Sequence, residues 1–263
     1  MTATLVLAAH GARGEEWGSV MRSLAELVRR ARPGRRVELG FLELSSPALI
    51  DVLAAVPGPV VVVPLLLAGG YHVHIDLPSV IARTRPDARV TGQLGPHPLL
   101  TAVLARRLVA AGLRSCDAVV LGAAGSSDPA ALEDVRAAAR LLSVRLSRPV
   151  TAAFASAGTP TVDQALERIR SGPAPRTVIA SYLLAPGHFH ERLIASGADA
   201  VGAPIGVDDD VAALVWRRFD RAVVAGHPVS PVRPVRARRL PSLSLTADFP
   251  PPGGPGVTGA SDA

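Results

Sequence analysis

Val60 to Pro78 have the sequence VVVVPLLLAGGYHVHIDLP, and this stretch decides the fold. Its first eight residues form an apolar run without alternation, which is typical of a strand covered on both faces. The Gly69-Gly70 pair that follows predicts a sharp turn. Because Pro64 cannot donate a hydrogen bond to a neighbouring strand, we expect a bulge or a sheet edge there. The stretch therefore predicts a buried parallel strand that ends at a glycine turn.

Two histidines follow this turn directly. They are His72 and His74, and the Asp76 and Pro78 beyond them suit the first turn of a helix. Open α/β sheets bind their ligands beyond the carboxyl ends of their strands. We therefore expect both imidazoles at the ligand-binding edge of a sheet.

The segments around this stretch alternate between strand and helix. Upstream, a predicted strand at Thr4–Ala9 leads through a glycine-bearing loop into an amphipathic helix at Trp17–Ala31. A second strand at Val37–Leu42 is followed by Glu43 and by a helix that begins near Pro47. Downstream we expect a helix, a short strand and a helix, near residues 76–83, 88–91 and 99–111. This alternation predicts a parallel sheet with right-handed crossovers.

The pattern repeats in the second half of the chain. VLAAHGAR at Val6–Arg13 is echoed by VLGAAGSS at Val120–Ser127, and GFLELSSPAL from Gly40 by AFASAGTPTV from Ala153. PLLLAGGYHVH from Pro64 is echoed by SYLLAPGHFH, with one residue deleted at the turn. Offsets of 114, 113 and about 116 residues over three separate segments indicate a tandem duplication.

The predicted fold class is α/β, with two tandem duplicated domains that are each a parallel sheet flanked by helices. We place the N-terminal domain at residues 1–114 and the duplicated domain at residues 115–226. Residues 227–263 hold eight prolines and almost no periodic apolar residue, which predicts a disordered C-terminal tail.

All 28 basic residues are Arg, and the formal net charge is +6 at pH 7. This balance favours anionic partners, such as polycarboxylates, phosphates or nucleic acid. Only 3% of the residues are aromatic, so the stacking surfaces of single-strand binders are missing and we do not expect nucleic acid.

The location of the protein is predicted from three further features. No apolar run approaches the roughly 20 residues of a membrane span, and no basic leader precedes the first strand. The single cysteine, Cys116, cannot form an internal disulfide, which fits a reducing compartment. We therefore expect a cytoplasmic protein without membrane contact, with Cys116 buried at the start of a strand.

His10, Glu43 and His72 are each predicted at the carboxyl end of a strand, and so at one edge of one parallel sheet. Two neutral imidazoles and a carboxylate suit a divalent ion such as Fe²⁺, Co²⁺, Ni²⁺ or Zn²⁺. The same three groups also suit proton transfer near neutral pH. Taken singly, His10 could instead cap its loop, Glu43 could sit at a helix N-terminus, and His74 could be an exposed helix residue.

The second half keeps only part of this set. Ala124 and Ser156 stand at the positions of His10 and Glu43, whereas the histidine pair survives as His188 and His190. We therefore expect one full site, in the N-terminal half.

AAHGAR around His10, GFLEL around Glu43 and VPLLLAGGYHVHIDLP together resemble the sirohydrochlorin chelatases of the CbiX/SirB type, the class II chelatases. The resemblance runs from Leu5 to about Val224. Such proteins insert Fe²⁺ or Co²⁺ into sirohydrochlorin, an anionic tetrapyrrole, without a nucleotide. The resemblance implies a lyase of sirohaem or cobalamin biosynthesis whose substrates are the divalent metal ion and sirohydrochlorin.

The resemblance also implies roles for single residues. His10 and His72 would hold the metal, and Glu43 would accept a proton in catalysis. We expect Arg13 and His74 to contact the anionic substrate, although His74 stands where the family would place another basic or polar side chain. Arg83 and Arg85 are further candidates for binding the carboxylates of the tetrapyrrole, on the ground of their charge alone.

Two other classes of function compete with this one. A cobalt or nickel carrier would hold the ion through the same histidines without inserting it. A flavodoxin-like nucleotide or phosphate binder is disfavoured, because neither GxGxxG nor GxxxxGK[ST] follows the first strand.

Overall fold

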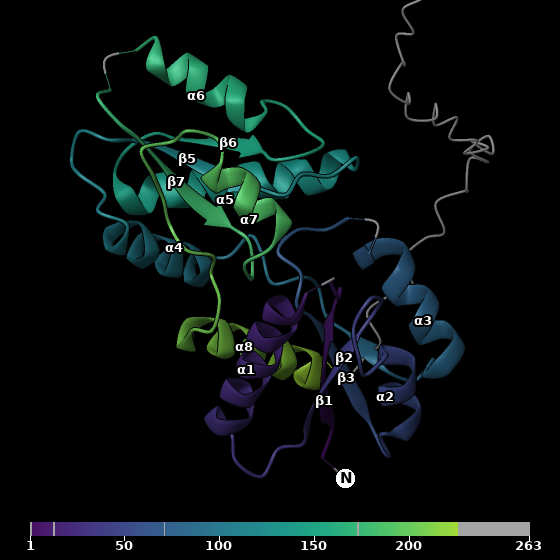
Figure 1. Cartoon of the computed structure of the whole chain (residues 1–263). Helices are drawn as coiled ribbons and strands as arrows, with labels where there is room; N and C mark the ends of the chain where they lie inside the picture. The colour runs from purple at the N-terminus through teal and green to yellow at the C-terminus, as the bar shows by residue number, and fades with distance from the viewer. Residues whose placement is uncertain (1, 13, 71, 173, 226–263) are drawn as a thin grey trace, which may run out of the picture. The chain divides into compact units, whose positions relative to one another are not determined.

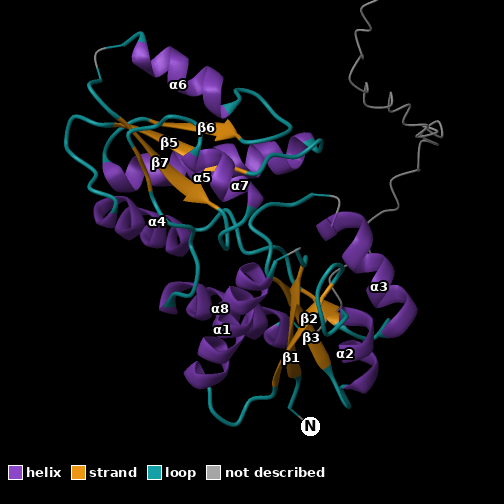
Figure 2. Ribbon diagram, viewed as in Figure 1, coloured by secondary structure: helices purple, strands orange, loops and turns teal. Residues whose placement is uncertain are grey.

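The computed structural model describes residues 2–12, 14–70, 72–172 and 174–225, with the backbone alone at His72. It contains two four-stranded parallel sheets, with strand orders β2-β1-β3-β4 and β6-β5-β7-β8. Helices flank both sheets (Figures 1 and 2). The predicted duplicated α/β fold is confirmed, whereas the predicted tail at residues 227–263 lies outside the described residues.

The first sheet has the apolar β1 at its centre. Its strands are β1 (Thr4–Ala9), β2 (Val37–Phe41), β3 (Val60–Pro64) and β4 (Arg89–Val90). Pro64 is the last residue of β3 and pairs with Ala8, while β4 pairs only with Val61 and Val62. The register is continuous, so Pro64 lies at the strand's end, beyond the reach of β4, and not at a bulge. Its missing N–H therefore leaves no gap in the β3–β4 ladder.

Helices cover the two faces of this sheet. The covering helices of this half are α1 (Glu15–Ala31), α2 (Leu49–Ala55) and α3 (Leu77–Thr84). A fourth helix, α4 (Pro98–Ala110), follows β4 and is described below. Met21, Leu24 and Val28 of α1 are fully buried at helical spacing in one core, and α2 and α3 bury apolar side chains in a second core on the other face. Between β3 and α3, residues His72–Asp76 form a short π-helix, η1, where the sequence predicted an ordinary helical turn.

The second half repeats this arrangement. Its elements are β5 (Ala118–Ala123), α5 (Pro129–Leu146), β6 (Val150–Phe154), α6 (Val162–Arg170), β7 (Thr177–Tyr182), α7 (His188–Ile194), β8 (Ala200–Val201) and α8 (Asp209–Val224). The first loops also match, because Gly11 has φ +98° and Gly125 has φ +101°. None of the helices in the described part of the chain is long and apolar enough to cross a membrane.

The last helix of each half packs against the other half. Helix α4 contacts β7 and α5, whereas α8 contacts α1 and β3 (Figure 1). Trp216 of α8 donates from Nε1 to the carbonyl oxygen of Val28 at 3.1 Å. The domain limits at residues 114 and 115 stay a prediction from the repeat, and the exchange of α4 and α8 ties the two sheets together.

An ion pair in this α1–α8 contact gives a testable pH dependence. Arg32 Nη1 and Nη2 donate to Asp220 at 2.6 and 2.7 Å, and this hydrogen bonding lowers the pKa of Asp220. Because the folded-state pKa lies below the unfolded one, the stabilisation is present above the ordinary carboxyl pKa and is lost as the pH falls through the folded pKa. Both side chains are more than a third exposed, which limits the effect.

We expect Asp220→Asn to lower the free energy of unfolding at pH 7 by at most about 1 kcal/mol. The difference from wild type should shrink as the pH falls below the ordinary carboxyl pKa of about 4 and through the lowered pKa of folded Asp220. Urea unfolding of both proteins at pH 7 and pH 3 measures this. An equal difference at both pH values would contradict the role of the charge.

Candidate functional site

The loops that follow β1 and β2 meet at the carboxyl edge of the first sheet. The Glu43 N–H donates to the His10 carbonyl oxygen at 3.0 Å, and the Leu42 N–H donates to Ala9 at 2.9 Å. The side chains of His10 and Glu43 meet as well, with His10 Nε2 3.3 Å from Glu43 Oε1. The structure thus brings two of the three predicted catalytic side chains together, as parallel strand ends should.

The hydrogen bond on the other ring nitrogen of His10 sets its chemistry. His10 Nδ1 lies 2.8 Å from the Gly11 carbonyl oxygen, and because a carbonyl can only accept, Nδ1 donates the proton. In the neutral imidazole, Nε2 then carries the lone pair and faces the Glu43 carboxylate. Two such electron-rich atoms attract each other only through a shared proton or cation.

The separation of these two atoms suits a shared metal ion. Ligands at about 2.1 Å from a metal lie about 3.0 Å apart at a right angle and about 3.4 Å apart at a tetrahedral angle. The observed 3.3 Å between His10 Nε2 and Glu43 Oε1 falls between these values. Both side chains are partly exposed, so an ion or a proton can reach them from solvent.

Gly11 makes the close approach of the two loops possible. A Cβ on Gly11 would lie 1.6 Å from the Glu43 carbonyl oxygen, and its φ of +98° disfavours any other residue. Ser45 adds a further link, since its hydroxyl donates to the Ala12 carbonyl oxygen at 3.2 Å. The position of Glu43 beside His10 therefore depends on glycine at residue 11.

The predicted histidine turn follows the neighbouring strand β3. The backbone of His72 begins η1, whose Val73 and His74 N–H groups both donate to the Gly70 carbonyl oxygen at 2.9 Å. The side chain of His72 and the whole of Arg13 lie outside the described residues. His74 is exposed, and its Nε2 lies 2.8 Å from the point that a Cβ on Gly69 would occupy. Its imidazole therefore covers the glycine turn.

Within the described side chains, no three His, Cys, Asp or Glu residues gather as a ready-made metal site. The predicted metal ligands His10 and His72 thus stay a prediction, and so do the substrate contacts of Arg13 and His74. The helix-terminus alternative for Glu43 is wrong, because α2 begins only at Leu49.

Other expectations from the sequence need correction. Arg85 donates to the Val56 and Gly58 carbonyl oxygens, which precede β3, so it lies at the opposite edge of the sheet and is wrong as a substrate ligand. Arg83 is exposed and donates from Nε to Ser79 within its own helix at 3.2 Å. Cys116 is exposed, not buried, because it lies in a turn two residues before β5.

The second half does not reproduce the site chemistry. Where His10 and Glu43 meet in the first half, the Ser156 hydroxyl donates to the Ala124 carbonyl oxygen at 2.6 Å. His188 is exposed, and burial lowers the pKa of His190, whose Nε2 has no hydrogen-bond partner among the described atoms. This half therefore offers imidazoles without a nearby carboxylate or histidine from its first two loops.

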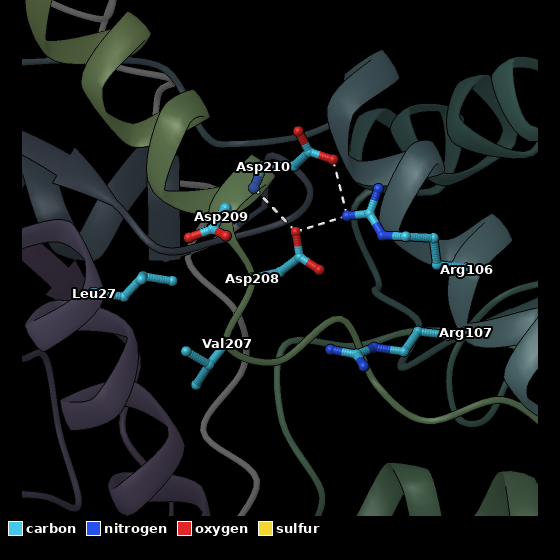
Figure 3. Close-up of a pocket in the computed structure, with 7 residues that line it drawn as sticks. All are labelled: Leu27, Arg106, Arg107, Val207, Asp208, Asp209 and Asp210. Carbon is cyan, nitrogen blue, oxygen red and sulfur yellow. Dashed lines mark hydrogen bonds and ion pairs between the residues drawn. The ribbon is translucent and has the colours of Figure 1, made fainter. Parts of the chain in front are cut away.

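A cavity of about 600 Å³ lies at the start of α8 and contains none of the predicted site residues (Figure 3). Three of its five charged side chains pair with one another, because Arg106 Nη2 contacts Asp208 at 2.7 Å and Asp210 at 2.9 Å. The Asp208 carboxylate also accepts from the Asp210 N–H at 3.0 Å and caps the helix. This cavity therefore lies beside the loop that leads into α8, the helix that packs against the first half.

Two further residues near the site come from the second half and were not predicted from the sequence. Asp134 of α5 accepts from the Gly69 N–H, and Tyr182 donates to the Leu67 carbonyl oxygen. Asp134 belongs to no recognisable motif, and Tyr182 lies in the repeat segment SYLLAPGHFH, which by itself does not predict a contact with the first half. A position-by-position comparison of the two repeats is the signal that could have found Asp134, because the repeat has valine there.

A family model matches nearly the whole of both repeats. The CbiX model covers residues 4–111 and 118–222. The chain belongs to the CbiX family. The family resemblance predicted from the three motifs is therefore confirmed.

The CbiX family assignment agrees with individual relatives. The sirohydrochlorin cobaltochelatase of Sulfolobus acidocaldarius is 32% identical over 90 residues, which cover 33% of this chain and 72% of that protein. Because the 90 aligned residues are 33% of this chain but 72% of the relative, the relative is less than half as long as this chain.

Two solved structures share the fold of this CbiX protein. SirB from Bacillus subtilis with Fe³⁺ has a TM-score of 0.74 and 22% identity, covering 84% of this chain and 96% of its own. The sirohydrochlorin chelatase SirB from Bacillus subtilis subspecies spizizenii in complex with cobalt has a TM-score of 0.71 and 21% identity, covering 86% and 97%. At these identities the likeness shows the fold alone.

Proposed function

We propose that this CbiX family member is a sirohydrochlorin chelatase, an enzyme that inserts Fe²⁺ or Co²⁺ into sirohydrochlorin. The observation that carries the proposal is the pair of His10 Nε2 and Glu43 Oε1, 3.3 Å apart at the carboxyl edge of the first sheet. The backbone of His72 opens the turn after the adjacent strand β3. A relative of the chain is a sirohydrochlorin cobaltochelatase, which supports the substrate.

The reaction exchanges two pyrrole N–H protons for one divalent ion. It therefore needs nitrogen ligands that hold the ion loosely enough to release it, and a base that takes up protons from the ring. His10 Nε2 and the His72 imidazole hold the ion, and the partly exposed site leaves positions for water and then for the pyrrole nitrogens. Glu43 accepts one of the two protons as the ion leaves His10, and the other passes to solvent water, which reaches the partly exposed site. No step requires a nucleotide.

Electrostatics support an anionic substrate. The net charge of +6 attracts a polycarboxylate, and Arg13 and His74 lie along the chain beside the metal ligands, where they contact its carboxylates. Sirohydrochlorin is the partner, with neither nucleic acid nor membrane involved. The single cysteine suits work in the reducing cytoplasm.

An anaerobic metallation assay tests the proposal. Sirohydrochlorin is mixed with Co²⁺ or Fe²⁺ and a small molar fraction of the protein, without nucleotide, and the absorbance of the metallated ring is followed. We expect many turnovers per protein molecule and a rate far above that of the free ion. A protein that binds Co²⁺ but leaves the metallation rate unchanged would be a carrier, and the proposal would then be wrong.

A further inference from the structure

The glycine turn of the first half is held by a carboxylate from the second half. The Gly69 N–H donates to Asp134 Oδ2 at 2.8 Å, and Gln93 Nε2 donates to the same oxygen at 2.9 Å. Gly70 also lies against α5, because a Cβ on it would be 3.7 Å from the Ala131 methyl group. Helix α5 therefore fixes the backbone just before the turn that carries the histidines.

The hydrogen bonds continue from this contact into η1. The Gly70 carbonyl oxygen accepts from the N–H groups of Val73 and His74. A Cβ on Gly69 would lie 2.8 Å from His74 Nε2 and 3.4 Å from Asp134 Oδ2, so the imidazole and the carboxylate both lie close to this glycine. Asp134 thus binds the N–H of Gly69, one residue before the Gly70 carbonyl oxygen that accepts the hydrogen bonds of η1.

A second contact from the same half fixes the residues just upstream. The Tyr182 hydroxyl donates to the Leu67 carbonyl oxygen at 3.0 Å. Tyr182 is 2% exposed, and its burial, followed by the negative charge of Asp134, raises the pKa of its hydroxyl, so it remains a donor at physiological pH. Gly95 makes room for this contact, because a Cβ there would lie 2.0 Å from the hydroxyl oxygen.

The corresponding turn of the second half lacks these means of support. At the matching positions the chain has Val20 for Asp134, Pro186 for Gly69 and Pro204 for Gln93. Valine has no hydrogen-bond acceptor in its side chain, and proline has neither a backbone N–H nor a side-chain amide. The carboxylate contact is therefore specific to the turn that leads into His72.

We propose that Asp134 is a positioning residue for the metal site, because its carboxylate fixes the Gly69-Gly70 turn and so the backbone that carries His72 and His74. The effect on metal insertion rests on the function proposed above, whereas the fixing of the turn does not. The second half, which has Ala124 and Ser156 in place of His10 and Glu43, thereby supports the chemistry of the first.

The test compares Asp134→Ala with Glu133→Ala, its neighbour on the same helix. Glu133 is exposed and pairs with Arg136 and Arg140, so it is a control for loss of a carboxylate on α5. Amide hydrogen exchange should become faster at Gly69, Val73 and His74 in Asp134→Ala and should not change in Glu133→Ala. The affinity for Co²⁺ alone should fall by about 10- to 100-fold in Asp134→Ala only.

A conservative variant separates positioning from simple destabilisation. The amide oxygen of Asp134→Asn can accept both hydrogen bonds, so this variant should restore the exchange protection and most of the Co²⁺ affinity. If Asp134→Ala does not fold, Asp134→Val carries the residue of the repeat at this position, and the same two losses are expected from it.

Unchanged exchange at Gly69, Val73 and His74 in Asp134→Ala would overturn the inference, and so would wild-type affinity for Co²⁺. Faster exchange spread evenly over both sheets would mark a purely structural role and would overturn it too. A wild-type protein that binds Co²⁺ but does not metallate sirohydrochlorin would contradict the proposed function. The exchange and Co²⁺ measurements would still decide the role of Asp134 in that case.

Discussion

Replacing His72 by alanine should abolish metal insertion while leaving the fold intact. The variant removes one of two imidazoles proposed to hold the ion, so the loss in insertion rate should exceed the roughly 100-fold that outer partners of a metal ligand can cost. The turn itself should survive, because its backbone is fixed through Gly69 and Gly70. Metallation rates and thermal unfolding of the variant, measured in parallel, check both expectations.

His188→Ala is the matched control for this variant. His188 occupies the corresponding place in the second half, where it is exposed and begins α7. Because Ala124 stands where the first half has His10, its loss should leave insertion near the wild-type rate. A comparable loss of activity in both variants would show that the site is not confined to the first half.

The second large effect is expected at Gly11, where alanine should destabilise the protein by about 3 kcal/mol or more. The added methyl group would overlap the Glu43 carbonyl oxygen, at 1.6 Å, in a backbone conformation that alanine already disfavours. The loops after β1 and β2 must then move apart, which separates His10 from Glu43. Chemical denaturation measures the change in stability.

Gly34→Ala controls for backbone conformation alone. Gly34 has φ +86°, is exposed, and has no atom within 4 Å of an added Cβ. This variant should cost only about 1 to 2 kcal/mol, the price of a left-handed conformation. Equal destabilisation by the two variants would mean that the loops do not make the close contact described here.

Much of the fold follows from local patterns in the sequence. The valine run of β3, the glycine turn and the repeated segments each depend on residues close together in the chain, so they predicted the parallel sheets and the duplication. The meeting of His10 and Glu43 followed from one general rule, that parallel strands end at a common edge.

The features that the sequence did not predict depend on distant residues. An apolar helix face does not specify which sheet it covers, so the exchange of α4 and α8 between the halves left no signal in the periodicity. For Arg85, charge alone suggested a contact with the substrate, whereas the acceptors at Val56 and Gly58 draw the guanidinium to the opposite edge of the sheet. Asp134 likewise gains its role only through contact with Gly69, 65 residues away.

We propose above that His10 and His72, with Glu43 beside them, bind one divalent ion at the edge of the first sheet. A crystal structure of the protein with Co²⁺ tests it most directly, through the anomalous signal of the metal. We predict a single strong peak at about 2.1 Å from one nitrogen of each imidazole. A cobalt ion bound at His188 and His190 instead, with none between residues 10 and 72, would show that this assignment of the site is wrong.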